Sequence, residues 1–375
     1  AGPDANNPAT LVRPIDQTLV PANIGPRGFQ LREATRSTDN YFAEQTLDAA
    51  YLGLDVTWRE TVRVNLGMRE ERNDQSVTTF QVGAQQTPVV ARLEATDRLP
   101  AGALTWYYSD DAQLRLGYGE TLSRPDFREL SQAPFTDPLL DTEVIGNPNL
   151  VAASLKNFDL RWEYYFSGSE SFTVALFLKE FDKPIEQVQV PGTGDLLSYA
   201  NAESARNYGV EFDLYKSFDF LHRFDWLDRG WLKGTKWENW YVSGNYAFIE
   251  SNVELGEANL IQTNQERPLQ GQSPYVVNLQ FGYLNPESGL EASLVYNRFG
   301  QRISNVGVQG LPDIFEDPFN QLDFVYKQNL PIENLVLKAR LRNLLDPDAS
   351  FSQGEEITRL AKKGRELSLA LEWKF

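Results

Sequence analysis

The amino-acid sequence alternates apolar and polar side chains with a period of two over most of its length. In residues 156–166, Phe158, Leu160 and Trp162 fall on one face of an extended chain, and Asp159 and Glu163 fall on the other. Apolar residues that repeat every 3.6 positions over a helix length are hard to find. The pattern therefore predicts an almost entirely β protein.

About thirteen segments carry this alternation. Strands are expected near residues 45–57, 61–72, 100–108, 112–121, 156–166, 170–187, 205–217, 237–250, 274–285, 290–302, 321–330, 334–345 and 365–375. The connections alternate between short (59–60, 109–111, 167–169, 285–289, 331–333) and long (73–99, 122–155, 188–204, 251–273, 303–320, 346–364). Outer-membrane barrels have short periplasmic turns and long extracellular loops. The fold class predicted is all-β, a transmembrane antiparallel β-barrel.

Residues 218–236 break this rule, because they form a long connection at the end where turns should be short. Phenylalanine, leucine and tryptophan stand there among charges, which favours a partly helical connection or an aromatic anchor at the membrane interface. The single histidine, His222, also lies there. It is expected to be solvated or packed rather than a metal ligand.

Composition restricts the chemistry that this chain can perform. It contains no cysteine, and one histidine offers little for a catalytic triad or a zinc site. The excess of 52 acidic over 35 basic residues, a net charge of -17, argues against a nucleic-acid partner. We therefore predict a protein that is not an enzyme, with no catalytic residue, metal site or cofactor.

Strand parity bears on the organisation of the chain. Bacterial single-chain barrels have an even number of strands and both termini in the periplasm, so thirteen strands counted back from Phe375 place residue 1 outside the cell. Unless the count is wrong by one, residues 1–44 are expected to be an extracellular loop remnant or irregular segment. Residues 45–375 then supply barrel strands, and strands outside this chain complete the barrel.

Several motifs in order resemble a known family. They are YGETLSRPDFREL (118–130), GNPNL (146–150), NFDLRWEYYF (157–166), VALFLKEFDKPIE (174–186) and NYGVEFDLY (207–215). Together they look like the C-terminal barrel of TonB-dependent outer-membrane receptors. The resemblance implies a 22-stranded barrel, an N-terminal plug domain, and uptake driven by TonB with its inner-membrane motor. Neither the plug nor the TonB box is recognised here, so both are expected upstream or on another chain.

Charged residues at strand ends and on the polar faces are the candidate site. Glu120, Arg124 and Arg128 are expected at the lumen rim, where they would touch plug or ligand; the alternative is an ordinary strand end at Pro125. A second set is expected to face the lumen, because charge on the lipid face is costly. It either contacts the plug or forms a solvated wall, and comprises Arg161, Glu163, Lys179, Arg340 and Arg342.

The last strand, LSLALEWKF, is expected to turn its leucines to lipid, with Trp373 and Phe375 in the periplasmic aromatic girdle. By resemblance, the aromatic C-terminus is the signal read by the barrel assembly machinery. Acidic groups near 137–143 and 313–317 match no calcium loop and are expected to be solvated.

The resulting hypothesis is a component of a receptor in the outer membrane of a Gram-negative bacterium. It would take up a scarce nutrient, such as a siderophore, vitamin, oligosaccharide or peptide, within a membrane of lipid and lipopolysaccharide. The alternatives are a passive channel or structural barrel subunit completed by another chain, and a soluble β-rich binding protein.

Overall fold

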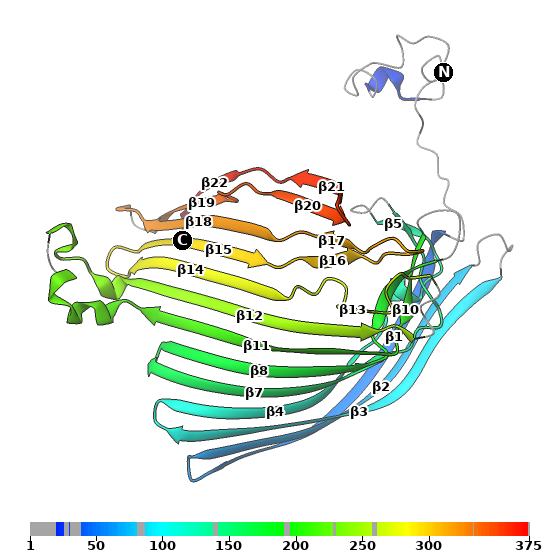
Figure 1. Cartoon of the computed structure of the whole chain (residues 1–375), viewed down its shortest axis with the longest axis horizontal. Coiled ribbons are helices and arrows are strands. Elements are labelled where there is room, and N and C mark those ends of the chain that lie inside the picture. The colour runs from blue at the N-terminus through cyan, green and yellow to red at the C-terminus, as the bar shows by residue number, and fades with distance from the viewer. Residues whose placement is uncertain are drawn as a thin grey trace.

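The strands form one long antiparallel sheet in the computed structural model. The structure describes residues 20–25, 30, 39–80, 87–137, 142–190, 196–227, 230–256, 261–332 and 334–373. Within these residues thirteen strands follow in chain order, each hydrogen-bonded to the next (Figure 1). They are β1 (Tyr41–Trp58), β2 (Val62–Phe80), β3 (Pro88–Ser109), β4 (Ala112–Ser123), β7 (Ala153–Ser167), β8 (Glu170–Asp182), β11 (Ser204–Ser217), β12 (Trp240–Glu254), β14 (Tyr275–Asn285), β15 (Leu290–Phe299), β18 (Phe319–Asn329), β19 (Leu335–Arg342) and β22 (Glu366–Trp373).

The two ends of this wall differ, as the sequence predicted. At the short-turn end, on the left of Figure 1, most connections are tight turns, and the exception carries the 3-10 helices η3 (Asp219–Arg223), η4 (Asp225–Leu227), η5 (Gly230–Leu232) and η6 (Trp237–Asn239). At the long-loop end stand helix α3 (Phe127–Leu130) and two small sheets. One sheet contains β5 (Phe135–Asp137), β6 (Thr142–Val144), β10 (Leu196–Asn201) and β9 (Ile185–Gln189). The other contains β16 (Arg302–Asn305), β17 (Ile314–Glu316), β20 (Asp348–Gln353) and β21 (Glu356–Lys362). Beside them β13 (Glu266–Arg267) pairs with β12, and η1 (Pro21–Asn23) precedes the wall.

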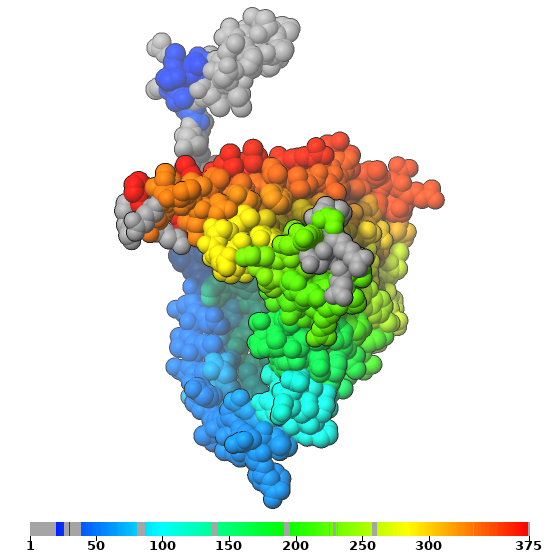
Figure 2. Space-filling model, turned by 90° about the vertical axis from the view of Figure 1, so that its left-hand side faces the viewer, coloured from blue at the N-terminus to red at the C-terminus, as the bar shows by residue number. Residues whose placement is uncertain are grey.

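Alternation gives the wall two different faces, because successive side chains of a strand point to opposite sides. The convex face is apolar: Leu367, Leu369 and Leu371 are 63%, 67% and 67% exposed. The concave face borders the hollow that Figure 2 shows from the short-turn end, between the first strands (blue) and the middle strands (green). No helix among the described residues is long and apolar enough to cross a membrane.

Each of the thirteen predicted strands has a counterpart in the wall, but the loop predicted over 73–99 is wrong. β2 and β3 continue as a paired hairpin to Phe80 and Pro88. Residues 73–79 are mostly polar and resemble a loop, yet Val77 and Ala91 are buried in a cluster with Leu130 of α3. This segment is therefore a strand because it packs against another loop, and that contact leaves no signal in the local sequence pattern.

The strand predicted over 170–187 is two strands, β8 and β9. Lys183 between them has a positive φ of 52°, and Pro184 cannot donate to the ladder. The irregular segment predicted over 1–44 lies mostly outside the described residues, and β1 already begins at Tyr41.

Candidate functional site

A buried carboxylate organises the concave face of β4 and β7. Glu163 is 4% exposed; the Nε atoms of Arg161 and Arg115 lie 2.8 and 3.5 Å from its Oε1. The side-chain amide of Gln113 and the hydroxyl of Tyr165 also donate to it. Because all these donors lie within the wall, the charge of Glu163 is satisfied without a ligand.

A second carboxylate plays the same part on β18. Asp323 is 4% exposed; Arg340 donates to its Oδ2 at 3.0 Å, and Arg342 lies 4.0 Å away. The backbone N–H of Asn343 and the side chain of Gln321 donate to its Oδ1, each at 3.0 Å. The two predicted arginines thus reach one shared acid across neighbouring strands.

Lys179 has a different environment. It is exposed on β8, in register with Asn157 and Asn207, and lines a cavity of about 490 Å³ together with Asp159 and Glu211. Among the described residues no ion pair to Lys179 forms, and the same holds for the two acids. These three groups are therefore the charges of this part of the wall that remain available to a partner.

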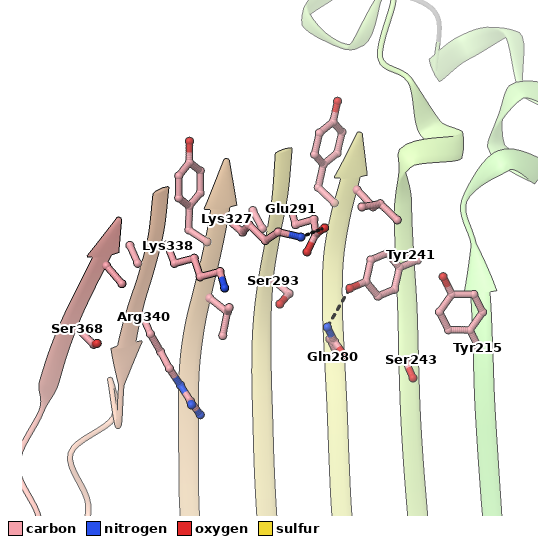
Figure 3. Close-up of a pocket in the computed structure, with 17 residues that line it drawn as sticks. Tyr215, Tyr241, Ser243, Gln280, Glu291, Ser293, Lys327, Lys338, Arg340 and Ser368 are labelled. Atoms are coloured by element: carbon pink, nitrogen blue, oxygen red, sulfur yellow. Dashed lines mark hydrogen bonds and ion pairs between the residues drawn. The ribbon is translucent and has the colours of Figure 1, made fainter. Parts of the chain in front are cut away.

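A larger cavity, of about 770 Å³, lies on the concave face near the short turns, and Figure 3 shows its side chains rising from neighbouring strands. Lys327 donates to Glu291 at 2.6 Å, Lys338 projects beside this pair, and Arg340 lies further along β19. The sequence pattern placed Lys338 on the polar face with Arg340, but neither lysine was predicted as a site residue, although period-two alternation puts both on that face.

The loop after β4 is fastened to the concave face of β2 and β3. Arg124 donates to Glu71 and to Asp97, each at 2.8 Å, and the side-chain amide of Gln75 donates to the carbonyl of Pro125 at 2.9 Å. Arg124 is only 17% exposed. Its guanidinium therefore joins the loop to the wall.

The other two rim residues lie elsewhere. Glu120 accepts the hydroxyl of Tyr118 and lies on the same face of β4 as Leu116, which is the convex face. Arg128 is exposed on α3, with its guanidinium carbon 4.6 Å from the ring centroid of Phe135. The structure does not bring the three predicted rim residues together in one site.

The motif GNPNL closes the same loop. The N–H of Gly146 donates to the carbonyl of Ser131 at 2.8 Å, and the N–H of Asn147 donates to that of Glu129 at 2.6 Å. The side-chain amide of Asn147 reaches the carbonyl of Tyr199 at 2.9 Å. A Cβ on Gly146 would lie 2.7 Å from the Glu129 carbonyl oxygen, so only glycine fits here without a shift.

A buried ion pair joins two loops that sequence reasoning did not connect. Arg267 on β13 donates to Glu186 on β9 at 2.9 Å, and the two side chains are 2% and 8% exposed. Burial raises the pKa of Glu186, and the neighbouring guanidinium opposes that rise. Beside the pair, Gln270 donates to Gln187 at 3.1 Å.

The acidic loop residues that the structure describes form no cluster suited to a metal ion. Over the described part of the chain, no group of three or more histidine, cysteine, aspartate or glutamate side chains could hold an ion. Asp313 is buried rather than solvated as predicted, because it accepts the N–H of Gly307 and the side chain of Asn264 at 2.9 Å.

Comparison with protein families shows the family to which this chain belongs. The model of the TonB-dependent receptor-like β-barrel matches residues 6–344. The chain belongs to the TonB-dependent receptor β-barrel family. This is a family of outer-membrane receptors and transporters rather than enzymes. No curated protein sequence matches the chain significantly.

Solved structures share the TonB-dependent barrel fold at low identity. The ferric-catecholate import receptor Fiu of E. coli K12 superposes with a TM-score of 0.63 at 14% identity, over 93% of this chain and 47% of that one. The siderophore receptor PiuA of Acinetobacter baumannii superposes with a TM-score of 0.63 at 14% identity, over 89% of this chain and 44% of that one. The ferric yersiniabactin uptake receptor FyuA of Yersinia pestis superposes with a TM-score of 0.60 at 16% identity, over 89% of this chain and 46% of that one. The chain thus spans less than half of each.

The last strand of this TonB-dependent barrel wall presents its apolar side outward. Trp373 lies on the convex face with the leucines of β22 and is 61% exposed. Phe375, the other half of the predicted assembly signal, lies outside the described residues.

Proposed function

We propose that this chain supplies barrel wall to an outer-membrane receptor that imports a scarce nutrient with energy delivered by TonB. The observation that carries the proposal is the family match over residues 6–344, on a wall with an apolar convex face and a charged concave face. The solved neighbours are named for ferric siderophores, which makes ferric siderophores the favoured substrate class.

The charged groups of the concave face fall into two sets with different proposed roles. The carboxylates of Glu163 and Asp323 each pair with arginines, and these pairs join neighbouring strands. Lys179, Asp159 and Glu211 line the 490 Å³ cavity without such pairing in the described residues. We therefore assign contact with plug or solute to these three, and a positioning role to Arg161, Arg340 and Arg342.

Partners follow from the family. A plug domain would occupy the hollow in front of the concave face, and TonB with its motor would act on that plug. The convex face would contact lipid and lipopolysaccharide, and the barrel assembly machinery would insert the wall. The exposed leucines of β22 support this placement and weigh against a soluble binding protein.

The test is uptake by cells. A strain lacking the receptor that contains this chain is complemented with it, under iron limitation, and accumulation of radioactive iron from a panel of ferric siderophores is measured with and without TonB. Uptake that requires both the receptor and TonB supports the proposal. Entry of small solutes that persists without TonB would instead indicate a passive channel.

A further inference from the structure

Residues 218–227 and 230–240 form a platform at the short-turn end. The backbone N–H of Phe218 donates to the carbonyl of Trp240 at 2.9 Å, which closes the base of the segment. Lys236 reaches Glu287 on the next turn at 2.7 Å, and His222 pairs with Glu238 at 2.8 Å. In Figure 1 the 3-10 helices project beyond the strand ends of β11 and β12.

The first residues of the platform adjoin a row of aromatic rings on the convex face. The Trp162 indole N–H donates to the hydroxyl of Tyr108 at 2.6 Å, and the rings of Trp162 and Tyr164 lie 6.3 Å apart. The Tyr164 and Phe166 rings lie 5.1 Å apart, and the Lys216 amine lies over Phe166 at 5.4 Å. The row therefore runs from β3 to β7, and the Lys216 amine connects it to β11.

The same row continues through the platform to the next strands. Phe220 lies 5.5 Å from the Lys216 amine and 6.2 Å from the Phe218 ring. Phe218 lies 5.8 Å from Phe281 of β14, whose ring stacks on Trp240 at 5.2 Å. The platform is thus continuous with the outward aromatic belt and lies on the lipid side of the rim.

Beyond the belt the platform leaves large apolar side chains uncovered. Phe224 and Trp226 are 46% and 65% exposed, while Leu227 beside them is buried. Four of the eight tryptophans of the chain fall within residues 226–240. Tryptophan is enriched at membrane–water interfaces, where its ring sits among the headgroups.

Charge in the platform is balanced rather than basic. Residues 218–240 contain four arginines or lysines and four aspartates or glutamates. Attraction to anionic lipid needs an excess of basic residues, so it cannot be the main force here. We propose that Phe224 and Trp226 insert into the phospholipid surface of the periplasmic leaflet, and that the platform anchors this rim of the wall. The inference requires a membrane-spanning wall and is independent of which solute is transported.

Spin labelling tests this insertion directly. Because residues 1–375 contain no cysteine, Trp226→Cys and, separately, Phe224→Cys introduce single labels into the receptor, with any cysteine outside this chain replaced. Asp110→Cys, on the exposed β3–β4 turn, is the matched control. The receptor is placed in phospholipid nanodiscs, and collisions of each label with oxygen and with a water-soluble nickel chelate are measured.

At positions 224 and 226 the label should collide more with oxygen and less with the nickel chelate than at position 110. These values should be the same in neutral and anionic lipid and at high salt. Chelate collisions equal to those at position 110 would overturn the proposal. So would insertion seen only with anionic lipid, or a label shielded only after periplasmic protein is added, which would indicate a protein partner. TonB-dependent uptake is measured separately, so its loss would not be mistaken for loss of the anchor.

Discussion

Removing one member of the buried Glu186–Arg267 pair should loosen the long-loop end of the wall. Glu186→Gln leaves the guanidinium of Arg267, only 2% exposed, without its counter-charge, and among the described residues its Nε has no hydrogen-bond partner even in the intact pair. Breaking a buried pair from one side costs about 3–5 kcal/mol. At about 1.4 kcal/mol per tenfold change, the opening equilibrium should rise by about 10²- to 10⁴-fold.

Amide hydrogen exchange measures this opening, since amides released by local unfolding exchange in proportion to the open population. Faster exchange is expected in β9, β10 and β13, with the wall strands β7 and β8 unchanged. The matched control is Glu180→Gln, which breaks the exposed Glu180–Arg206 pair and should change exchange little, since such pairs contribute about 0–1 kcal/mol.

The double variant Glu186→Leu with Arg267→Met distinguishes the effect of an unpaired buried charge from the effect of altered packing. It removes both charges, so exchange should return most of the way to that of the unaltered protein. If Glu186→Gln exchanges no faster than the control, the pair does not hold these loops together.

Two further outcomes are expected. Gly146→Ala should destabilise the loop around α3 by about 1–3 kcal/mol, seen as faster proteolysis. Gly168→Ala should not, because a Cβ added there has no described heavy atom within 4 Å. Lys179→Ala should weaken solute binding by about 10- to 100-fold in a Kd measurement, as loss of a charged hydrogen bond implies; an equal effect of the convex-face variant Arg206→Ala would contradict a lumenal role.

Alternation was enough to predict the thirteen strands and their two faces, because that signal is local and repeats every second residue. It placed Arg161 and Arg340 on the charged side for the same reason. The ion pair between Glu186 and Arg267 has no such signal, since the two residues lie on different loops and meet only through the fold. The rim position expected for Glu120 rested on its closeness to Pro125, whereas strand parity turns its side chain to the convex face.

The paired charges of the concave face also have an electrical consequence. Arg340 with Asp323 and Lys327 with Glu291 join neighbouring strands, so each pair forms a small dipole directed around the circumference of the wall. Opposite charges a few ångströms apart largely cancel at the distance of a passing solute. Along these strands a cation and an anion would meet similar potentials. Discrimination between solutes would then depend on the long loops and on the groups that face Lys179. The wall itself would suit solutes of either net charge.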